Sequence, residues 1–232
     1  MASFARALFA WCLLVTPARA EEPLPAFIDA TVEAYGGVDA LKRAATVLQQ
    51  GKVTSVAREG REGAMARLYS VPMRLRVEVF YGPDEGDLRV LDGARGWREG
   101  RPVNGPALEA MVLQAARLEL PLSLLEHKAS VKDLGRAERD GVTVRILELA
   151  VSPTLFVRAE IDVATHRLVR SLGRSTGRQP IEFVTSYSDY RKVDGVLFAF
   201  TEKNLAMGQP TGDTTFMRVQ LLPEAPAGTF MP

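Results

Sequence analysis

The chain has 232 residues, of which 47% are hydrophobic and 25% are charged. Its 29 basic residues nearly balance its 28 acidic ones, which argues against nucleic acid as a partner because such proteins normally carry a basic excess. The length suffices for one domain with a substantial core, and a single cysteine excludes a disulfide framework.

The first twenty residues have the pattern of a secretory signal peptide. Arg6 supplies the positive start, residues 7–15 form a short apolar run, and residues 18–20 (ARA) form a small-x-small cleavage site. We expect cleavage after Ala20, which also removes the only cysteine, Cys12. An exported chain without disulfides is typical of a bacterial periplasm. The sequence therefore predicts a signal peptide over 1–20 and a single periplasmic domain over 21–232.

Two short helices are expected at the start of this domain. The first spans residues 25–35, where an apolar stripe at helical spacing runs from Phe27 to Tyr35. The pair Gly36–Gly37 ends it, and a second helix is expected over residues 38–45.

From residue 47 onward the hydrophobic period changes to two, which indicates strands. Turn signals such as Asp140–Gly141 and Asp194–Gly195 separate twelve segments of this kind. The expected strands cover residues 47–56, 64–70, 73–80, 87–91, 96–99, 131–136, 142–149, 155–162, 168–173, 181–190, 196–204 and 214–221. Residues 208–212 (GQPTG) are expected to form a turn. So many consecutive strands must curl or close. We predict an α+β fold, a strongly curved antiparallel sheet of about 11–12 strands forming a half-closed β-barrel, covered by the N-terminal and mid-chain helices.

A helical insert over residues 106–128 interrupts the strands. Pro106 suits the first position of a helix, and Leu108, Met111, Val112 and Leu118 follow at helical spacing. The insert has two interpretations: it plugs the sheet and completes a dry core, or it covers a cavity for an apolar guest.

The hairpin over residues 186–200 carries an unusual aromatic load. Phe198 and Phe200 are two residues apart, so they point to the same face of the sheet. If that face is concave, both line a cavity. If it is not, Leu197 and Ala199 face the guest instead.

Signatures of catalysis are absent from the sequence. His127 and His166 are far apart, and no HExxH, CxxC, G-x-S-x-G or Gly-rich phosphate loop occurs. We therefore expect no enzymatic activity, no catalytic residue, no metal ligand and no cofactor.

Four short stretches resemble the periplasmic lipoprotein-carrier superfamily, the fold of the LolA and LolB outer-membrane lipoprotein-sorting proteins. They are AYGGVDAL at residues 34–41, EIDVATHRLVR at 160–170, YSDYRKVDGVLFAF at 187–200 and PEAPAGTFMP at 223–232. The second is similar to a D-x-x-T-x-x-L-x-R segment of that superfamily. The chain departs from many relatives in having Ala199 in place of Pro, and it has no lipobox.

The resemblance implies a soluble, monomeric periplasmic carrier that holds lipoprotein acyl chains or another lipid under a helical lid. It also implies donor proteins in the inner membrane and acceptor proteins in the outer membrane. One inward-facing arginine would hydrogen-bond the lid, with Arg67, Arg74 and Arg76 as alternatives. The expected lipid-contacting residues are Met65, Met73, Leu75, Trp97, Leu108, Met111, Val112, Leu118, Leu122, Phe198 and Phe200. The alternative function is a non-catalytic periplasmic protein-interaction module with a filled core.

Overall fold

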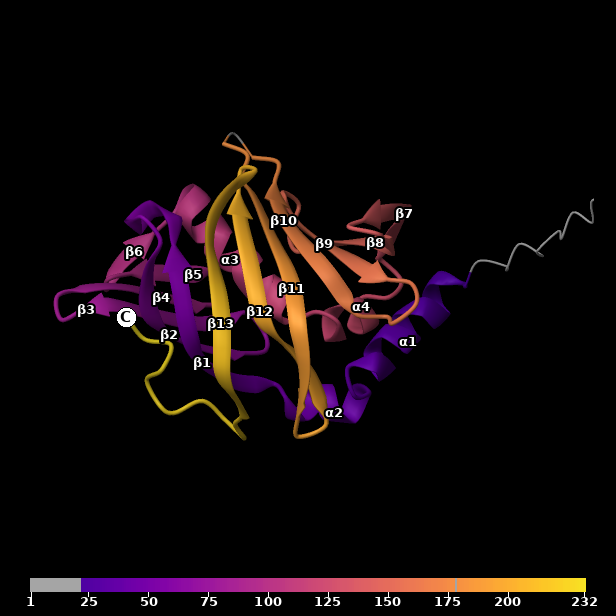
Figure 1. Cartoon of the computed structure of the whole chain (residues 1–232), viewed down its shortest axis with the longest axis horizontal. Helices are drawn as coiled ribbons and strands as arrows, with labels where there is room; N and C mark the ends of the chain where they lie inside the picture. The colour runs from indigo at the N-terminus through magenta and orange to yellow at the C-terminus, as the bar shows by residue number, and fades with distance from the viewer. Residues whose placement is uncertain (1–21, 178) are drawn as a thin grey trace, which may run out of the picture.

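The computed structural model describes residues 22–177 and 179–232, so the expected signal peptide lies outside the described residues. The described residues form one antiparallel sheet, in the order β6-β5-β4-β3-β2-β1-β13-β12-β11-β10-β9-β8-β7 (Figure 1). Its strands are β1 (Thr46–Ser55), β2 (Arg61–Ser70), β3 (Arg74–Gly82), β4 (Glu85–Asp92), β5 (Arg95–Arg98), β6 (Arg101–Val103), β7 (Lys132–Arg139), β8 (Val142–Ala150), β9 (Leu155–Asp162), β10 (Leu168–Ser175), β11 (Glu182–Val193), β12 (Val196–Ala206) and β13 (Gln209–Leu221). Strands β6 and β7 are the two ends of the sheet, which is not closed into a barrel.

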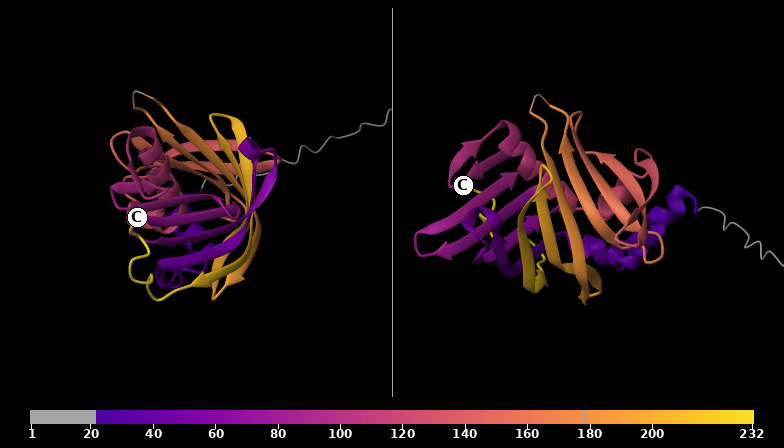
Figure 2. Two further views of the ribbon diagram at one scale, coloured as in Figure 1. Left: turned by 90° about the vertical axis from the view of Figure 1, so that its left-hand side faces the viewer. Right: turned by 45° about the horizontal axis from the view of Figure 1, so that its top comes forward.

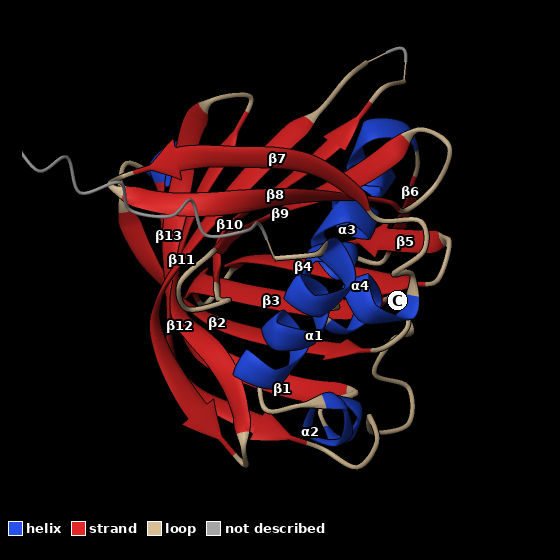
Figure 3. Ribbon diagram, turned by 90° about the vertical axis from the view of Figure 1, so that its right-hand side faces the viewer, coloured by secondary structure: helices blue, strands red, loops and turns tan. Residues whose placement is uncertain are grey.

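The strong curvature predicted from the sequence is confirmed. The sheet bends into a trough, and the helices lie on its concave side (Figures 2 and 3). They are α1 (Leu24–Ala34), α2 (Val38–Arg43), α3 (Gly105–Leu118) and α4 (Leu122–Glu126). A short 3-10 turn, η1 (Val56–Arg58), connects β1 to β2. The expected insert over residues 106–128 therefore corresponds to two helices, separated near Pro121.

Alternation of side chains along the strands explains which residues face the helices. On β3, Leu75, Val77 and Val79 are buried, whereas Arg74 and Arg76 point to the convex face. On β2, Met65, Arg67 and Tyr69 share the concave face. The arginine of β2 thus points inward and the two arginines of β3 do not.

Helix α3 bridges the two arms of the trough. At one end Gly96 of β5 lets the helix approach closely, because a Cβ there would lie 2.9 Å from Leu108 Cδ1. At the other side Leu113 and Ala116 pack against Leu155 and Val157 of β9. The helix therefore spans the opening of the trough.

The β11–β12 hairpin turns at Asp194–Gly195, as the sequence predicts. Both residues have positive φ, 50° and 86°, which is the conformation that an Asp-Gly hairpin turn requires. The tip packs against the end of α1, where Gly36 has φ 116° and a Cβ would lie 2.3 Å from the Gly195 carbonyl oxygen. Leu197 N–H donates to the Tyr35 carbonyl at 3.1 Å. Two of the stretches that carry the family resemblance therefore pack against each other.

Two local expectations differ from the structure. The sheet has a thirteenth strand, β6, which is only three residues long and carries too few residues to show a period. The segment at 208–212 is not a turn, because β13 already begins at Gln209 and the turn is formed by Met207 and Gly208. Both residues of that turn have positive φ.

The C-terminal segment covers part of the convex face. Phe230 forms a small buried cluster with Leu68 and Val90, and Trp97 packs against it. The Arg74 guanidinium lies 5.2 Å from the Phe230 ring centre, and Arg76 donates to the Thr229 carbonyl. The late phenylalanine of the chain thus serves to seal the outer side of β2–β5.

Candidate functional site

The concave face and α3 enclose a cavity of about 420 Å³, the large cavity. Apolar side chains from both arms and from the helix line it, including Val53, Met65, Val79, Val103, Met111, Leu113 and Phe183. Residues 107, 110, 111, 114 and 117 supply the helix side at helical spacing. Its volume lies within the range of about 300–1,000 Å³ that is usual for small-molecule sites.

The charged lining of the large cavity is unbalanced. Its five arginines are Arg58, Arg67, Arg89, Arg98 and Arg117, and its two carboxylates are Asp87 and Glu202. The exposed fraction of these arginines ranges from 61% for the Arg98 side chain to 1% for Arg67. The cavity therefore combines apolar walls with an excess of positive charge.

Three of these residues, Arg67, Glu202 and Arg117, form what we call the central ion cluster. Arg67 on β2 donates to both Glu202 oxygens, at 3.0 and 2.7 Å, and its Nε donates to Gln49 at 2.8 Å. Arg117 on α3 reaches the same carboxylate at 3.1 and 3.3 Å and donates to the Tyr187 hydroxyl at 3.2 Å. The cluster therefore ties the end of the helix to the sheet.

The central ion cluster is buried and holds one more positive than negative charge. Burial alone would raise the pKa of Glu202, yet the charges of Arg117 and Arg67 and their hydrogen bonds hold it far below its usual range. Glu202 thus stays ionised at neutral pH. An ionised carboxylate shared by two guanidiniums is costly to remove, because it would leave both cations unpaired.

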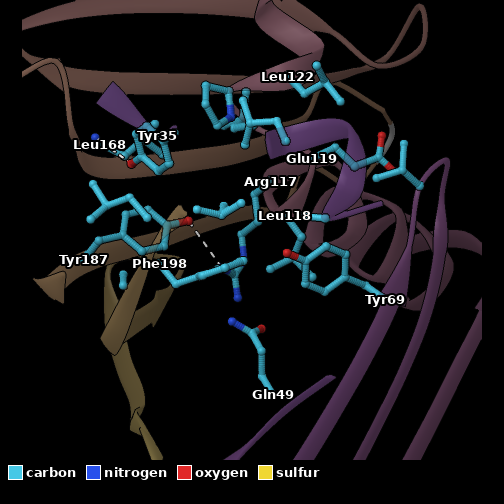
Figure 4. Close-up of a pocket in the computed structure, with 18 of the residues that line it drawn as sticks. Tyr35, Gln49, Tyr69, Arg117, Leu118, Glu119, Leu122, Leu168, Tyr187 and Phe198 are labelled. Carbon is cyan, nitrogen blue, oxygen red and sulfur yellow. Dashed lines mark hydrogen bonds between the residues drawn. The ribbon is translucent and has the colours of Figure 1, made fainter. Parts of the chain in front are cut away.

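A second, small cavity of about 90 Å³ lies on the other side of this cluster. Tyr35, Tyr69, Tyr187 and Leu118 are among its lining residues, and Figure 4 shows Arg117 pointing toward Tyr187 across it. Arg67, Glu202 and Arg117 line both cavities. The central ion cluster is therefore a wall shared by the two.

Three tyrosines of the small cavity, Tyr35, Tyr187 and Tyr190, have hydrogen-bond partners in the fold. Tyr190 donates to the Leu168 carbonyl at 2.6 Å, and Leu168 N–H donates to Tyr35. The two tyrosine hydroxyls lie 3.1 Å apart, which leaves Tyr35 to donate to Tyr190. Burial raises the pKa of Tyr35 to about 12. These hydroxyls hold β10 and β11 against α1 and stay protonated.

Glu119 fixes the point where α3 ends. Its carboxylate accepts a hydrogen bond from the Met73 backbone N–H in the turn between β2 and β3. Burial raises the pKa of this carboxyl, although the hydrogen bond from Met73 works in the opposite direction. With Arg117 two residues earlier, the helix is attached to the sheet mainly at its C-terminal end.

The expected lipid-contacting residues fall into three groups. Met65 and Met111 line the large cavity, and Leu118, Leu122 and Phe198 line the small one. Five others lie in or against the core without lining either cavity: Met73, Leu75, Leu108, Val112 and Phe200. Trp97 is the exception, because it packs with Val90 and Phe230 on the convex face, away from both cavities.

The β12 phenylalanines lie where the alternation of the hairpin breaks. Tyr187 and Tyr190 of β11 both line the small cavity although they are three residues apart, and Asp189 between them has a positive φ of 53°. The guanidinium of the exposed Arg191 lies 4.5 Å from the Phe200 ring centre. Phe198 lines the small cavity, together with Leu197 and Ala199 at the end of the hairpin.

Of the charged residues in the central ion cluster, only Arg67 was named from the sequence. Arg67 was one of three alternatives, and its phase with Met65 and Tyr69 on β2 would have selected it. Glu202 and Arg117 are 135 and 85 residues away from their partners in this cluster. Nothing local in the sequence indicates that they meet.

No group of three or more histidine, cysteine, aspartate or glutamate side chains that could hold a metal ion occurs among residues 22–177 and 179–232. Within the same ranges, no helix is long and apolar enough to cross a membrane.

Comparison with known structures identifies the fold. A domain described as an outer membrane lipoprotein-sorting protein from Vibrio parahaemolyticus matches with a TM-score of 0.55 at 12% identity, covering 89% of this chain and 95% of that one. A LolA superfamily protein from Nitrosomonas europaea matches with a TM-score of 0.54 at 12% identity, covering 84% and 96%. A DUF1329 family protein from Desulfovibrio piger gives 0.53 at 11% identity, covering 90% and 98%. No protein-family model and no curated protein matches the chain.

The resemblance read from the sequence is thus confirmed at the level of the fold. The chain has the LolA-like α+β fold, a curved antiparallel sheet with helices on its concave side. At such low identities the likeness concerns the fold and says nothing of individual residues.

Proposed function

We propose that this protein is a non-catalytic periplasmic carrier that binds the acyl chain of a lipid or lipoprotein in the large cavity under α3. The observation that carries the proposal is the cavity itself, about 420 Å³ between the concave face and the helix. Burial of acyl methylenes there would contribute about 0.8 kcal/mol each. The LolA-like fold of the chain supports this proposal.

The attachment of α3 supports the same function. The helix covers the cavity along its length, yet the central ion cluster and Glu119 hold it at its C-terminal end. Its first residues, 105–107, are exposed. The N-terminal half is held by apolar packing, such as that of Leu108 on Gly96, so a guest would enter by displacing this half while the polar contacts hold the other.

The alternative, a protein-interaction module with a filled core, predicts no space under the helix. The large cavity favours the carrier over this alternative. Transfer to the outer membrane, donor and acceptor proteins and a monomeric state are parts of the proposal that rest on the family resemblance. Cleavage after Ala20 rests on the signal-peptide pattern of residues 1–20.

The test starts from the full chain, exported with its own leader and purified from the periplasm. We expect organic extraction and mass spectrometry to find a co-purifying lipid or acylated protein. We also expect the delipidated protein to bind a fluorescent fatty acid. Ala110→Trp places a large ring in the large cavity and should abolish binding, whereas Ala150→Trp, at an exposed position, should not.

Absence of any co-purifying lipid together with no fatty-acid binding would refute the carrier function. Equal binding by the two tryptophan variants would place the guest elsewhere. Circular dichroism of each variant checks that the fold is retained.

A further inference from the structure

One arginine of the large cavity lacks the hydrogen bonds that the others have. Arg89 lies on the concave face of β4, and its Nε is buried without a hydrogen bond. That atom lies 2.9 Å from an Asp87 oxygen but lacks the direction for hydrogen bonding. Among the described residues the guanidinium makes one hydrogen bond, a long one of 3.5 Å from Nη1 to Gln114 Oε1 of α3. A guanidinium has five N–H donors, so most of its capacity is unused.

A second arginine, Arg98, lies beside Arg89 and adds positive charge next to its unbonded N–H donors. Arg98, its partner across the β4–β5 ladder, shares the same Asp87 carboxylate at 2.7 Å. Burial lowers the pKa of Arg89, the nearby charge of Arg98 acts in the same direction, and Asp87 opposes both. The central ion cluster is different, because both of its arginines grip Glu202 through paired bonds. The N–H donors available to an anion that enters the cavity are therefore those of Arg89.

We propose that the guest is an anionic amphiphile whose phosphate or carboxylate binds at Arg89 and Arg98, with its acyl chain along the apolar wall near Met65 and Met111. This inference rests on the proposed carrier function and names the class of guest. A planar guanidinium matches the oxygens of phosphate and carboxylate in paired geometry. Arg98 is exposed at the edge of the cavity, which places the polar head near water and the chain inside.

The position of Arg89 also couples the head group to the helix. An acidic group at Arg89 competes with Gln114, whose long bond is a contact between β4 and α3. Binding of the head group thus releases the middle of α3 while its C-terminal end stays attached at Arg117. A neutral amphiphile has no such effect.

The test compares probes that share one chain and differ in the head: dodecyl phosphate, dodecanoate, dodecanol and dodecyltrimethylammonium, with inorganic phosphate alone as a fifth probe. Binding is measured by calorimetry, below micelle formation, on the delipidated protein purified from the periplasm. We expect the two anionic amphiphiles to bind at least about tenfold more tightly than dodecanol, the cation to bind most weakly, and inorganic phosphate to bind poorly.

Arg89→Gln should abolish the preference for anions, so that dodecyl phosphate and dodecanol bind with similar affinity. The matched control is Arg174→Gln. Arg174 also shares a carboxylate with a second arginine, its Nε also lacks a hydrogen bond, and its side chain is 32% exposed against 31% for Arg89, yet it lines neither cavity. Arg98→Gln changes the more exposed member of the pair, with 61% of its side chain exposed against 31% for Arg89, and should also weaken the preference for anions.

Equal affinity of the wild-type protein for all four amphiphiles would overturn the head-group proposal and leave the carrier function standing. Failure of all four to bind would refute the carrier function itself. If inorganic phosphate binds as tightly as dodecyl phosphate, the site binds free anions, and the proposal of an amphiphilic guest is overturned. An equal loss of preference in Arg174→Gln would show a general effect of charge and exclude a site at Arg89.

Discussion

The two cavities share one wall but treat their polar groups in opposite ways. In the small cavity, the hydroxyls of Tyr35, Tyr187 and Tyr190 all have hydrogen-bond partners within the fold. In the large cavity, Arg89 has an unbonded buried nitrogen, and positive charge is in excess. A buried polar group without a partner costs free energy. The polar groups of the small cavity thus stabilise the fold, whereas the unbonded nitrogen of Arg89 is where the proposed guest would bind.

The largest expected effect comes from neutralising Glu202 in the central ion cluster, which forms the wall shared by the two cavities. Glu202→Gln leaves two buried guanidiniums without their carboxylate and should lower the free energy of unfolding by about 3–5 kcal/mol. Urea denaturation at pH 7 measures it. The control is Glu148→Gln. The Glu148 carboxylate also pairs with two arginines, Arg158 and Arg174, but their side chains are about one third exposed. Solvent screening should limit that loss to about 1 kcal/mol, and equal losses would contradict the assigned role of burial.

Releasing α3 from the wall should have the next largest effect. Arg117→Met removes the bonds to Glu202 and Tyr187 but leaves Arg67 paired with Glu202. We expect amide hydrogens of α3 to exchange about tenfold faster, since charge-assisted bonds contribute roughly 1.5–3 kcal/mol. Mass spectrometry of peptides from residues 105–118 reports this, with β1 as the internal reference. Unchanged exchange would mean that packing alone holds the helix.

Enlarging the small cavity tests whether it has a binding role of its own. Leu118→Ala should cost about 1–2 kcal/mol of stability, because this side chain is only partly buried and leaves a modest void. Fatty-acid affinity should change by less than about twofold, in contrast to Ala110→Trp. A strong loss of affinity in Leu118→Ala would make the two cavities one binding site.

The smallest expected effect concerns the end of α3. Burial raises the pKa of Glu119, so its ionised form is disfavoured in the fold and stability is lost as pH rises above the ordinary glutamate range. Glu119→Gln keeps an acceptor for Met73 and should stabilise by a few tenths of a kcal/mol, roughly 0.5 at most, at pH 7. The gain should vanish below about pH 4. Thermal denaturation across this pH range checks the sign, and a destabilised variant at pH 7 would contradict it.

Local signals in the sequence predicted the fold well. The alternation of β3 and the turn at Asp194–Gly195 each depend on neighbouring residues, so they are readable without knowledge of the rest. The family motifs proved to be structural. Asp162 accepts hydrogen bonds from Ala164 N–H and the Thr165 hydroxyl, which closes the turn before β10. Such stretches indicate a fold and carry no information about a guest.

The site was predicted only in part, because its polar half depends on contacts between distant residues. Met65 and Met111 could be chosen as apolar and in phase with a strand and a helix. Trp97 was expected to contact the lipid but packs on the convex face, and its short strand offers no clear alternation from which that face could be predicted. Trp97 pairs with Val90, and Val90 packs against Phe230 from the far end of the chain. This contact determines which face of the sheet Trp97 occupies.

The open sheet, which ends at β6 and β7, has a consequence for the range of guests. The circumference of a closed barrel is fixed by its number of strands and their stagger. An open sheet has no such constraint, and a small change of twist at each of its strand pairs adds up across the trough. The internal space of such a sheet can change through the backbone as a whole. Under the proposed carrier function, this would accommodate acyl chains of different length while the central ion cluster stays intact.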